Sequence, residues 1–263
     1  MNILIVGRGW TGNKMRTELL RRNHVVHIIS HTEVFRYLNG LMGKYDWIIN
    51  CAGVTGTPNV DACESMKKET IEANAIFPVL LYDAARQMGS RFAHFSSGCT
   101  YQGEITSVHE EPNFFGSIYS VSKGISDSYL KDKAQVYRIR MPFTSVNETK
   151  NYLTKILKYA NSGKLIEGGK NSVTDLDEAV KVACKLIESG APDGPYNLVN
   201  QGSVTMHELV ELLNINPVWY TAEEFAQVTV ANRSNCTIPA YEEMSTVEYA
   251  VTKAIKILSH SSL

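Results

Sequence analysis

The first twelve residues combine a β-branched run with a glycine pattern, and this combination constrains the fold more than any other segment. The run from Asn2 to Val6 is typical of a buried strand, and a helical pattern with Met15 and Leu19 follows the glycines. Glycines let the backbone approach a pyrophosphate, and a helix N-terminus offers free N–H groups and a favourable dipole. We therefore predict a strand, a phosphate-binding turn and a helix. The predicted cofactor-binding residues of the turn are Gly7, Arg8, Gly9, Trp10, Thr11 and Gly12.

Apolar runs and helical patterns alternate through the next part of the chain. The expected strands cover residues 25–29, 47–51, 92–95 and 136–139, and the expected helices cover about 70–88 and 118–131. This alternation is typical of a parallel, doubly wound sheet with helices on both faces. The sequence therefore predicts an α/β fold of the Rossmann type.

The sequence changes character beyond Pro142. Helical patterns cover residues 152–161 and 175–189, and a hydroxyl residue precedes a Glu by three positions at Thr205, Thr221 and Ser245, which predicts a helix start at each. No linker rich in Pro, Gly or Ser separates the two halves. We expect a cofactor-binding domain at 1–145 and a smaller, mostly helical substrate lobe at 146–263. Part of 170–200 is expected to pack back on the first domain.

Composition limits the class of protein and its partners. The 263 residues are 44% hydrophobic and 20% charged, with a net charge of -1, as in soluble globular proteins. Lys and Arg are spread along the chain, and no apolar stretch is long enough to span a bilayer, so we expect no nucleic-acid or membrane partner. The five cysteines are scattered and lack a CxxC spacing, which argues against disulfides or a metal site and favours a cytoplasmic protein. A homodimer is left open.

The residues after the second and third expected strands bear on the choice of cofactor. Sites that prefer NAD(H) usually carry Asp or Glu at the end of the second strand, where this chain reads Ser30-His31-Thr32. With no carboxylate to repel a 2′-phosphate, and with Arg8 as its partner, NADP(H) is favoured over NAD(H), which stays open. A solvated loop charge is the alternative for Arg8. The other predicted cofactor-binding residues are Ser30, His31, Ala52, Gly53, Tyr119 and Lys123.

Tyr119 and Lys123 form a YxxxK pattern on one face of the expected 118–131 helix. Reducing a ketone needs a hydride from a nicotinamide and a proton for the developing alkoxide, and Tyr119 would supply the proton. Because its ordinary pKa is about 10, a nearby cation must favour the phenolate. Lys123 is expected to be that cation and to hold the ribose, while Ser97 would hydrogen-bond the carbonyl oxygen. Each residue alone fits a surface or turn position, but the order of the motifs favours catalysis.

These motifs resemble the extended short-chain dehydrogenases/reductases, and further segments resemble the nucleotide-rhamnose synthase/epimerase-reductase family. The matching segments are Asn50 to Gly56, Pro58 to Asp61, Cys63-Glu64, Gly98-Cys99, Pro112 to Phe114, Gly116-Ser117, Tyr119-Ser120, Arg138 to Pro142, Leu153 to Lys155 and Arg233 to Asn235. The resemblance covers nearly the whole chain. It implies conversion of UDP-4-keto-6-deoxy-D-glucose to UDP-L-rhamnose with NADPH, by epimerisation at C3 and C5 and reduction at C4. Family members usually carry GxxGxxG, whereas this chain has GxGxxG.

The resemblance also implies roles for single residues. Cys99 and Lys155 match the acid/base pair of the epimerisation, and Ser97 and Cys99, two apart on an expected extended segment, should point the same way. The implied substrate-binding residues are Thr55, Asn59, Asp61, Asn74 and Arg233, the last at the diphosphate of the nucleotide.

Two alternative functions remain at this point. One is a dTDP-4-dehydrorhamnose reductase without epimerase activity, in which Cys99 is a small buried hydrophobe and Lys155 lies on the polar face of its helix. The other is a non-catalytic dinucleotide-binding regulatory subunit. No motif distinguishes a uracil from a thymine nucleotide.

Overall fold

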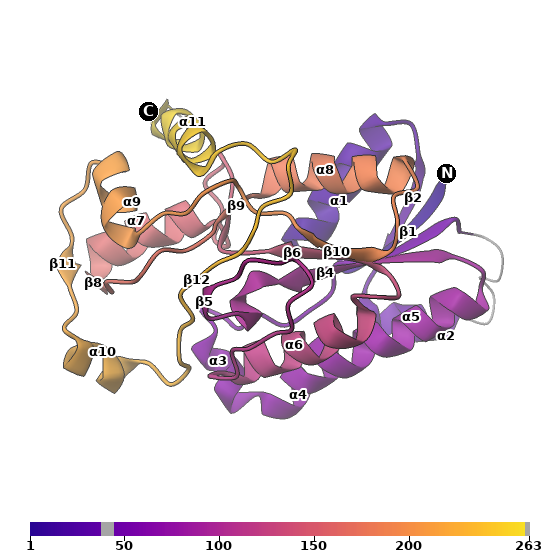
Figure 1. The fold of residues 1–263 in the computed structure, drawn as a ribbon, viewed down its shortest axis with the longest axis horizontal. Coiled ribbons are helices and arrows are strands. Elements are labelled where there is room, and N and C mark those ends of the chain that lie inside the picture. Colours follow the sequence, from indigo (N-terminus) through magenta and orange to yellow (C-terminus); the bar gives the residue numbers. More distant parts are fainter. Residues whose placement is uncertain (38–44, 261–263) are drawn as a thin grey trace.

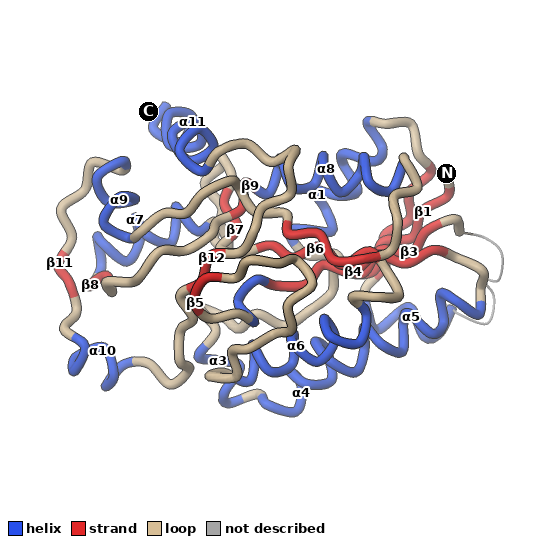
Figure 2. The backbone as a smooth tube through the Cα atoms, viewed as in Figure 1, coloured by secondary structure: helices blue, strands red, loops and turns tan. Residues whose placement is uncertain are grey.

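A central parallel sheet with helices on both faces organises the molecule (Figures 1 and 2). The computed structural model describes residues 1–37 and 45–260. These residues form a six-stranded sheet in the order β10 (Gly194–Asn197), β6 (Gln135–Ile139), β4 (Arg91–Ser97), β3 (Trp47–Asn50), β1 (Asn2–Val6) and β2 (Val25–Ile29). All neighbouring strands are parallel, which confirms the predicted Rossmann-type fold. The sequence analysis did not find β10.

Two layers of helices explain why β1 and β3 are nearly continuous apolar runs instead of alternating. One face is covered by α1 (Trp10–Arg21) and α8 (Leu176–Glu188). The other face is covered by α2 (His31–Tyr37), α5 (Phe77–Gln87) and α6 (Ile118–Leu130), with α3 (Asp61–Ser65) and α4 (Lys67–Ile71) nearby, and a π-helical turn, Glu72–Ile76, joins α4 to α5. Strands buried on both faces read as continuous hydrophobic runs, and every residue of β3 is buried.

The second half of the chain builds a lobe with its own apolar core at the end of the molecule away from the N-terminal strands (Figure 1). Its helices are α7 (Tyr152–Ser162), α9 (Met206–Leu212), α10 (Ala222–Val228) and α11 (Val247–His260). Short strand pairs join it internally and to the sheet domain: β5 (Gly103–Glu104) with β12 (Cys236–Thr237), β7 (Pro142–Phe143) with β9 (Thr174–Asp175), and β8 (Lys164–Leu165) with β11 (Val218–Trp219). The chain also returns to the sheet, because α8 packs on α1 and β10 pairs with β6.

The three predicted helix starts have different outcomes. Thr205 and Thr221 each form a complete capping box with the Glu three residues on, as predicted. The prediction at Ser245 was wrong. Its hydroxyl donates to Glu178 Oε2 at 2.9 Å, and α11 begins one residue later, where the Thr246 hydroxyl accepts from a backbone N–H at 3.4 Å. The Ser245 hydroxyl is therefore bound to a carboxylate of α8 and does not cap α11.

A buried ion pair joins α6 to the sheet. Arg138 of β6 donates to Asp127 of α6 through Nε and Nη2, with distances of 2.5 to 3.1 Å, and the two side chains are 1% and 0% exposed. Ser96 of β4 adds a hydroxyl donor to the same carboxylate at 2.6 Å. Because each oxygen of the carboxylate is hydrogen-bonded, the pair fixes the position of α6 against two strands.

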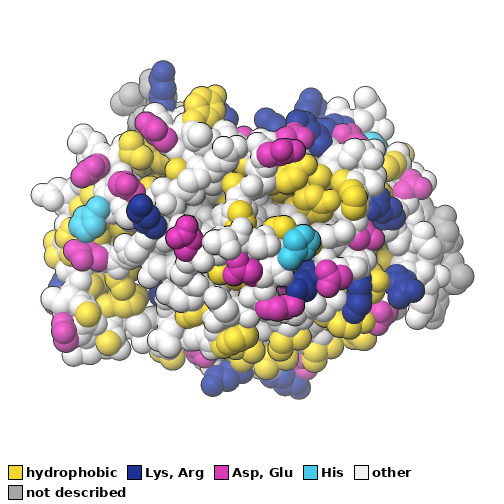
Figure 3. Space-filling view, viewed as in Figure 1, with side chains coloured by type: hydrophobic (Ala, Val, Ile, Leu, Met, Phe, Trp, Pro, Cys, Tyr) yellow, Lys and Arg dark blue, Asp and Glu magenta, His cyan; other side chains and the backbone are white. Residues whose placement is uncertain are grey.

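Figure 3 shows one face of the described residues, on which positively and negatively charged side chains are interspersed. Within 1–37 and 45–260, no helix has both the length and the apolar character that crossing a bilayer requires.

Removing one partner of the buried pair should destabilise the fold strongly. Asp127→Ala leaves the Arg138 guanidinium buried without its counter-ion, and we expect the free energy of unfolding to fall by about 3–5 kcal/mol in urea denaturation. The matched control is Glu243→Ala, which removes an exposed partner of Lys185 and should change it by less than about 0.5 kcal/mol. Equal effects in the two variants would contradict this role of the buried pair.

Candidate active site

A cleft of about 480 Å³ lies at the carboxyl edge of the sheet, where ligands bind in open α/β folds. All five predicted catalytic residues line it: Ser97, Cys99, Tyr119, Lys123 and Lys155. Other predicted residues that line it are Gly7, Arg8, Gly9, Trp10, Thr11, His31, Ala52, Gly53, Thr55 and Asn59. The lining does not include Gly12, Ser30, Asp61, Asn74 or Arg233.

The glycine loop has the shape that a dinucleotide pyrophosphate requires. A Cβ at Gly12 would lie 1.9 Å from the Gly7 carbonyl oxygen, so only glycine lets α1 start this close to the end of β1. Gly9 precedes α1 in an extended conformation and carries no side chain that could occupy the helix N-terminus. The free N–H groups of the first turn therefore face an open cradle, and the loop fits the cofactor that the sequence predicts.

Gly53, which follows β3, lets the backbone pass close to Lys123 on α6. A Cβ at Gly53 would lie 2.9 Å from Asn74 Oδ1 and 3.2 Å from Lys123 Nζ. Asn74 is fully buried and exchanges two hydrogen bonds of 2.8 Å with the backbone N–H and C=O of Val54. Its amide thus holds the loop beside Lys123 and does not face the cleft.

The end of β2 differs from the sequence prediction, because a carboxylate does lie there. The chain turns into α2 at His31, and Glu33 folds back so that its Oε2 accepts from the Ser30 N–H at 2.6 Å. The same carboxylate pairs with Arg8 at 3.2 Å, and the Ser30 backbone hydrogen bond lowers the pKa of Glu33. The premise that nothing here repels a 2′-phosphate was wrong, since the carboxylate comes from three residues further along.

Tyr119 and Lys123 extend from α6 into the cleft beside Ser97 at the end of β4. Burial raises the pKa of Tyr119, while interactions with the Ser97 hydroxyl and the Arg140 guanidinium lower it. Lys123 Nζ donates to the Phe95 carbonyl at 3.1 Å, and burial lowers its pKa to about 8. The cation that lowers the pKa of Tyr119 is thus Arg140, which the sequence analysis did not single out, whereas that analysis expected Lys123 in this role.

Cys99 lies on a short turn. The expected extended segment was wrong, because Gly98–Thr100 form a 3₁₀ turn in which the Ser97 hydroxyl accepts from the Cys99 N–H at 3.1 Å. Both side chains nevertheless line the cleft. The Ser120 hydroxyl donates to the Cys99 carbonyl at 3.0 Å, which connects this turn to α6 next to Tyr119.

Lys155 enters the cleft from α7 in the lobe. Burial lowers its pKa, and the positive charge of Lys150 lowers it further. A lysine whose pKa is lowered has more of the neutral amine that a proton acceptor needs at neutral pH.

Asp61 and Arg233 bind each other instead of lining the cleft. Asp61 Oδ2 accepts from Arg233 Nη2 at 2.7 Å, and its Oδ1 accepts from the N–H groups of Val230 and Ala231 at 3.1 and 2.8 Å. The start of α3 is thereby connected to a lobe segment about 170 residues later in the chain.

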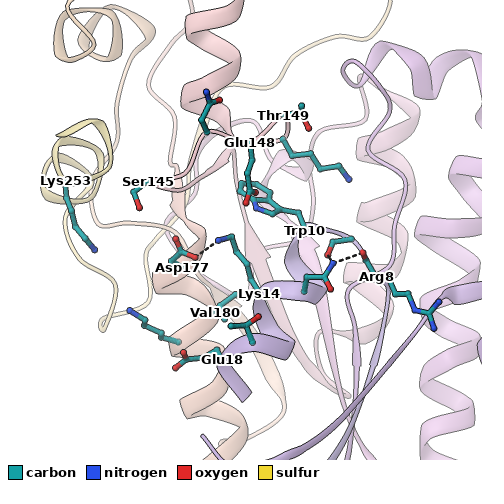
Figure 4. Close-up of a pocket in the computed structure, with 16 residues that line it drawn as sticks. Arg8, Trp10, Lys14, Glu18, Ser145, Glu148, Thr149, Asp177, Val180 and Lys253 are labelled. Carbon is teal, nitrogen blue, oxygen red and sulfur yellow. Dashed lines mark hydrogen bonds and ion pairs between the residues drawn. The ribbon is translucent and has the colours of Figure 1, made fainter. Parts of the chain in front are cut away.

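A second, larger cleft of about 1040 Å³ adjoins the glycine loop (Figure 4). It runs between α1, residues 145–150 and α8, and the Lys14–Asp177 ion pair of 2.7 Å crosses it. Four residues line both clefts: Arg8, Gly9, Trp10 and Lys150. None of the predicted catalytic residues is among the described residues that line the larger cleft, so the smaller one is the candidate active site.

Sequence reasoning missed several residues that line the active-site cleft. They are Cys51, Val60, Phe95, Ser96, Ile139, Met141, Pro142, Lys150 and Tyr152. Most of them follow or end a sheet strand, so the rule that sites lie at the carboxyl ends of parallel strands could have found them.

The fold, the glycine cradle and the Ser97, Tyr119 and Lys123 set together define an enzyme of the extended short-chain dehydrogenase/reductase type that uses a nicotinamide dinucleotide. A family model described as the RmlD substrate binding domain matches residues 1–259. The chain belongs to this family.

Similar proteins carry rhamnose-related names. A bifunctional dTDP-4-dehydrorhamnose 3,5-epimerase/dTDP-4-dehydrorhamnose reductase of Arabidopsis thaliana is 36% identical over 215 residues, covering 75% of this chain and 70% of that protein. A trifunctional UDP-glucose 4,6-dehydratase/UDP-4-keto-6-deoxy-D-glucose 3,5-epimerase/UDP-4-keto-L-rhamnose-reductase of the same plant is 37% identical over 206 residues, which are 72% of this chain and only 30% of that protein.

Solved structures share the fold over nearly the whole chain. A UDP-rhamnose synthase from Acanthamoeba polyphaga mimivirus matches with a TM-score of 0.86 at 23% identity, covering 98% of this chain and 99% of that one. A dTDP-4-dehydrorhamnose reductase from Bacillus anthracis, solved with NADP, matches with a TM-score of 0.79 at 18% identity, covering 99% and 100%.

The Arg8–Glu33 pair predicts a measurable effect on cofactor preference. Glu33→Gln removes the charge that repels a 2′-phosphate and frees Arg8, so the ratio of NADPH to NADH affinity should rise roughly tenfold. Dissociation constants from fluorescence titration of both cofactors measure this ratio without turnover. In the matched variant Arg8→Gln, NADPH binding should weaken while NADH binding changes little. A Glu33→Gln variant that alters both affinities equally would contradict the assignment.

Proposed function

We propose that this enzyme is a bifunctional 3,5-epimerase/4-reductase that converts UDP-4-keto-6-deoxy-D-glucose to UDP-L-rhamnose with NADPH, whose 2′-phosphate would bind Arg8 in place of Glu33, and that NADH is a second possible cofactor. The observation that carries the proposal is that Ser97, Tyr119 and Lys123 share one cleft with Cys99 and Lys155. The activities for which the two Arabidopsis thaliana relatives are named support the substrate class and both reactions. The five free cysteines support the predicted cytoplasmic location.

The reduction follows from the groups around Tyr119. A bound nicotinamide dinucleotide supplies the hydride that C4 of the sugar receives. Tyr119 Oη supplies the proton for the oxygen at C4, and the Ser97 hydroxyl holds that oxygen in place. We assign Lys123, which is close to Gly53, to the ribose hydroxyls of the cofactor.

The epimerisation uses the same ketone. Protons at C3 and C5 are acidic because both carbons flank the C4 carbonyl, and inversion requires removal of a proton from one face and return to the other. Lys155, with its lowered pKa, is the proton acceptor, and the Cys99 thiol returns a proton. Ser97 and Tyr119 stabilise the enolate oxygen that forms between the two steps.

A second candidate is a dTDP-4-dehydrorhamnose reductase without epimerase activity. It is favoured by the fold, which reductases of that name share, and by the hydrogen bonds of the Cys99 backbone, which suit a residue with a structural role.

Tyr119→Phe should lose reduction and retain cofactor binding. The variant keeps the ring and removes only the proton donor, so kcat for UDP-4-keto-L-rhamnose should fall at least about a hundredfold. Nucleotide-sugar analysis by mass spectrometry measures the product, and a fluorescence titration with NADPH serves as the control. Turnover like that of the wild type would contradict the proposal, and so would wild-type protein that binds NADPH but reduces no nucleotide sugar.

Solvent deuterium separates the two candidate functions. With UDP-4-keto-6-deoxy-D-glucose in D₂O, the wild type should incorporate deuterium at C3 and C5, and Cys99→Ser should lower that incorporation at least about tenfold. Reduction of the already epimerised UDP-4-keto-L-rhamnose by the same variant should stay within about threefold of the wild-type rate, because Tyr119 is intact. If the wild type incorporates no deuterium, the enzyme is a reductase only.

A further inference from the structure

Arg140 is a fully buried arginine at the end of β6, directly beneath the turn that carries Cys99. Its side chain is 1% exposed. Nη1 donates to the Gly98 carbonyl at 3.2 Å and to the Ser234 hydroxyl at 3.1 Å. Nη2 donates to the Ser234 carbonyl at 2.8 Å and to Asn171 Oδ1. The guanidinium is therefore anchored to the Cys99 turn on one side and to the lobe on the other.

Every acceptor of this guanidinium is neutral. Among residues 1–37 and 45–260, no carboxylate forms an ion pair with Arg140, and its buried Nε has no hydrogen-bond partner. Arg138, two residues earlier, is equally buried but is paired with Asp127. Burying a charge without a counter-ion is costly, so this guanidinium would be stabilised by any negative charge that forms nearby.

The groups around Arg140 show where such a partner would form. The positive charge of Arg140 lowers the pKa of Tyr119 on α6, Tyr152 on α7 and Cys236 on β12, against the opposing effect of burial. Of the titratable groups that face Tyr119, Cys99 and Cys63 raise its pKa and Arg140 lowers it. In the proposed reduction, Tyr119 becomes an anion when it gives up its proton.

We propose that Arg140 is a positioning residue of the active site, whose uncompensated charge stabilises the Tyr119 phenolate and whose bond to the Gly98 carbonyl holds the Cys99 turn. Arg140 does not line the cleft, so it acts through these two residues and not on the substrate. The inference rests on the proposed function, because it assigns Tyr119 to proton transfer.

The oxidative direction gives the sharpest test. When UDP-L-rhamnose is oxidised, the C4 hydroxyl proton passes to the Tyr119 phenolate while the C4 hydride passes to NADP⁺, so the rate depends on the fraction of phenolate. A nearby cation lowers the pKa of Tyr119, and removing it raises that pKa. The acid limb of the profile of kcat/KM against pH should therefore move to higher pH when the charge of Arg140 is removed.

Three variants separate charge from packing. Arg140→Gln should move the acid limb to higher pH and lower the rate at pH 8 at least about tenfold, since each pH unit of movement is tenfold. Asn171→Asp keeps Arg140 and gives it a counter-ion, and should move the limb in the same direction. Ser234→Ala removes a neutral hydrogen bond and should leave the limb where it is in the wild type.

The outcomes are distinguishable even if Arg140→Gln does not fold, because Asn171→Asp tests the same charge in a chain that retains the arginine. NADP⁺ affinity, measured by titration, shows that each variant still has an intact cofactor site. An unmoved acid limb in a folded Arg140→Gln or Asn171→Asp variant overturns the electrostatic role. A wild-type enzyme that binds NADPH but reduces no UDP-4-keto-L-rhamnose overturns the proposed function itself.

Discussion

The Asp127–Arg138 ion pair is the interaction on which the catalytic geometry depends. It is fully buried, it joins α6 to β6, and Ser96 of β4 completes it. Tyr119 and Lys123 lie on the same helix, so this pair, together with the hydrogen bonds from Ser120 and Lys123 to β4 and the Cys99 turn, fixes their position at the ends of β4 and β6. A helix held only by apolar contacts could slide along the sheet, whereas a hydrogen-bonded ion pair has one register.

The same strand end carries two buried guanidinium groups with different surroundings. Arg138 has a carboxylate partner and contributes to the fold, while Arg140 has only neutral acceptors and lies against the Cys99 turn. The difference lies in the hydrogen-bond partners. Arg138 binds Asp127 on α6 of the sheet domain, whereas Arg140 binds Ser234 and Asn171 of the lobe. Position relative to the lobe, and not residue type, separates the structural cation from the functional one.

Sequence reasoning succeeded where a feature depends on neighbours in the chain. The glycine turn, the apolar runs of the five expected strands, the 118–131 helix and two capping boxes are all local patterns, and the structure contains the matching elements. It failed where the structure depends on a group elsewhere in the chain. The Glu33 carboxylate accepts a hydrogen bond from the Ser30 N–H, and Glu178 binds the Ser245 hydroxyl that was expected to cap α11. The short strand β10 is defined by its pairing with β6.

The lobe also determines which groups surround the Arg140 guanidinium, and so whether its charge is neutralised. Asp61, at the start of α3, is hydrogen-bonded to Ala231 and Arg233 of the lobe. The chain continues from there to Ser234, which accepts from Arg140, and to Cys236, whose thiol donates to the Gly98 carbonyl of the Cys99 turn. A carboxylate in this segment would neutralise Arg140. The segment presents a hydroxyl, a carbonyl and a thiol instead, and Asn171 presents an amide. The lobe therefore fixes the guanidinium without consuming its charge, which leaves that charge available to an anion formed on the cleft side.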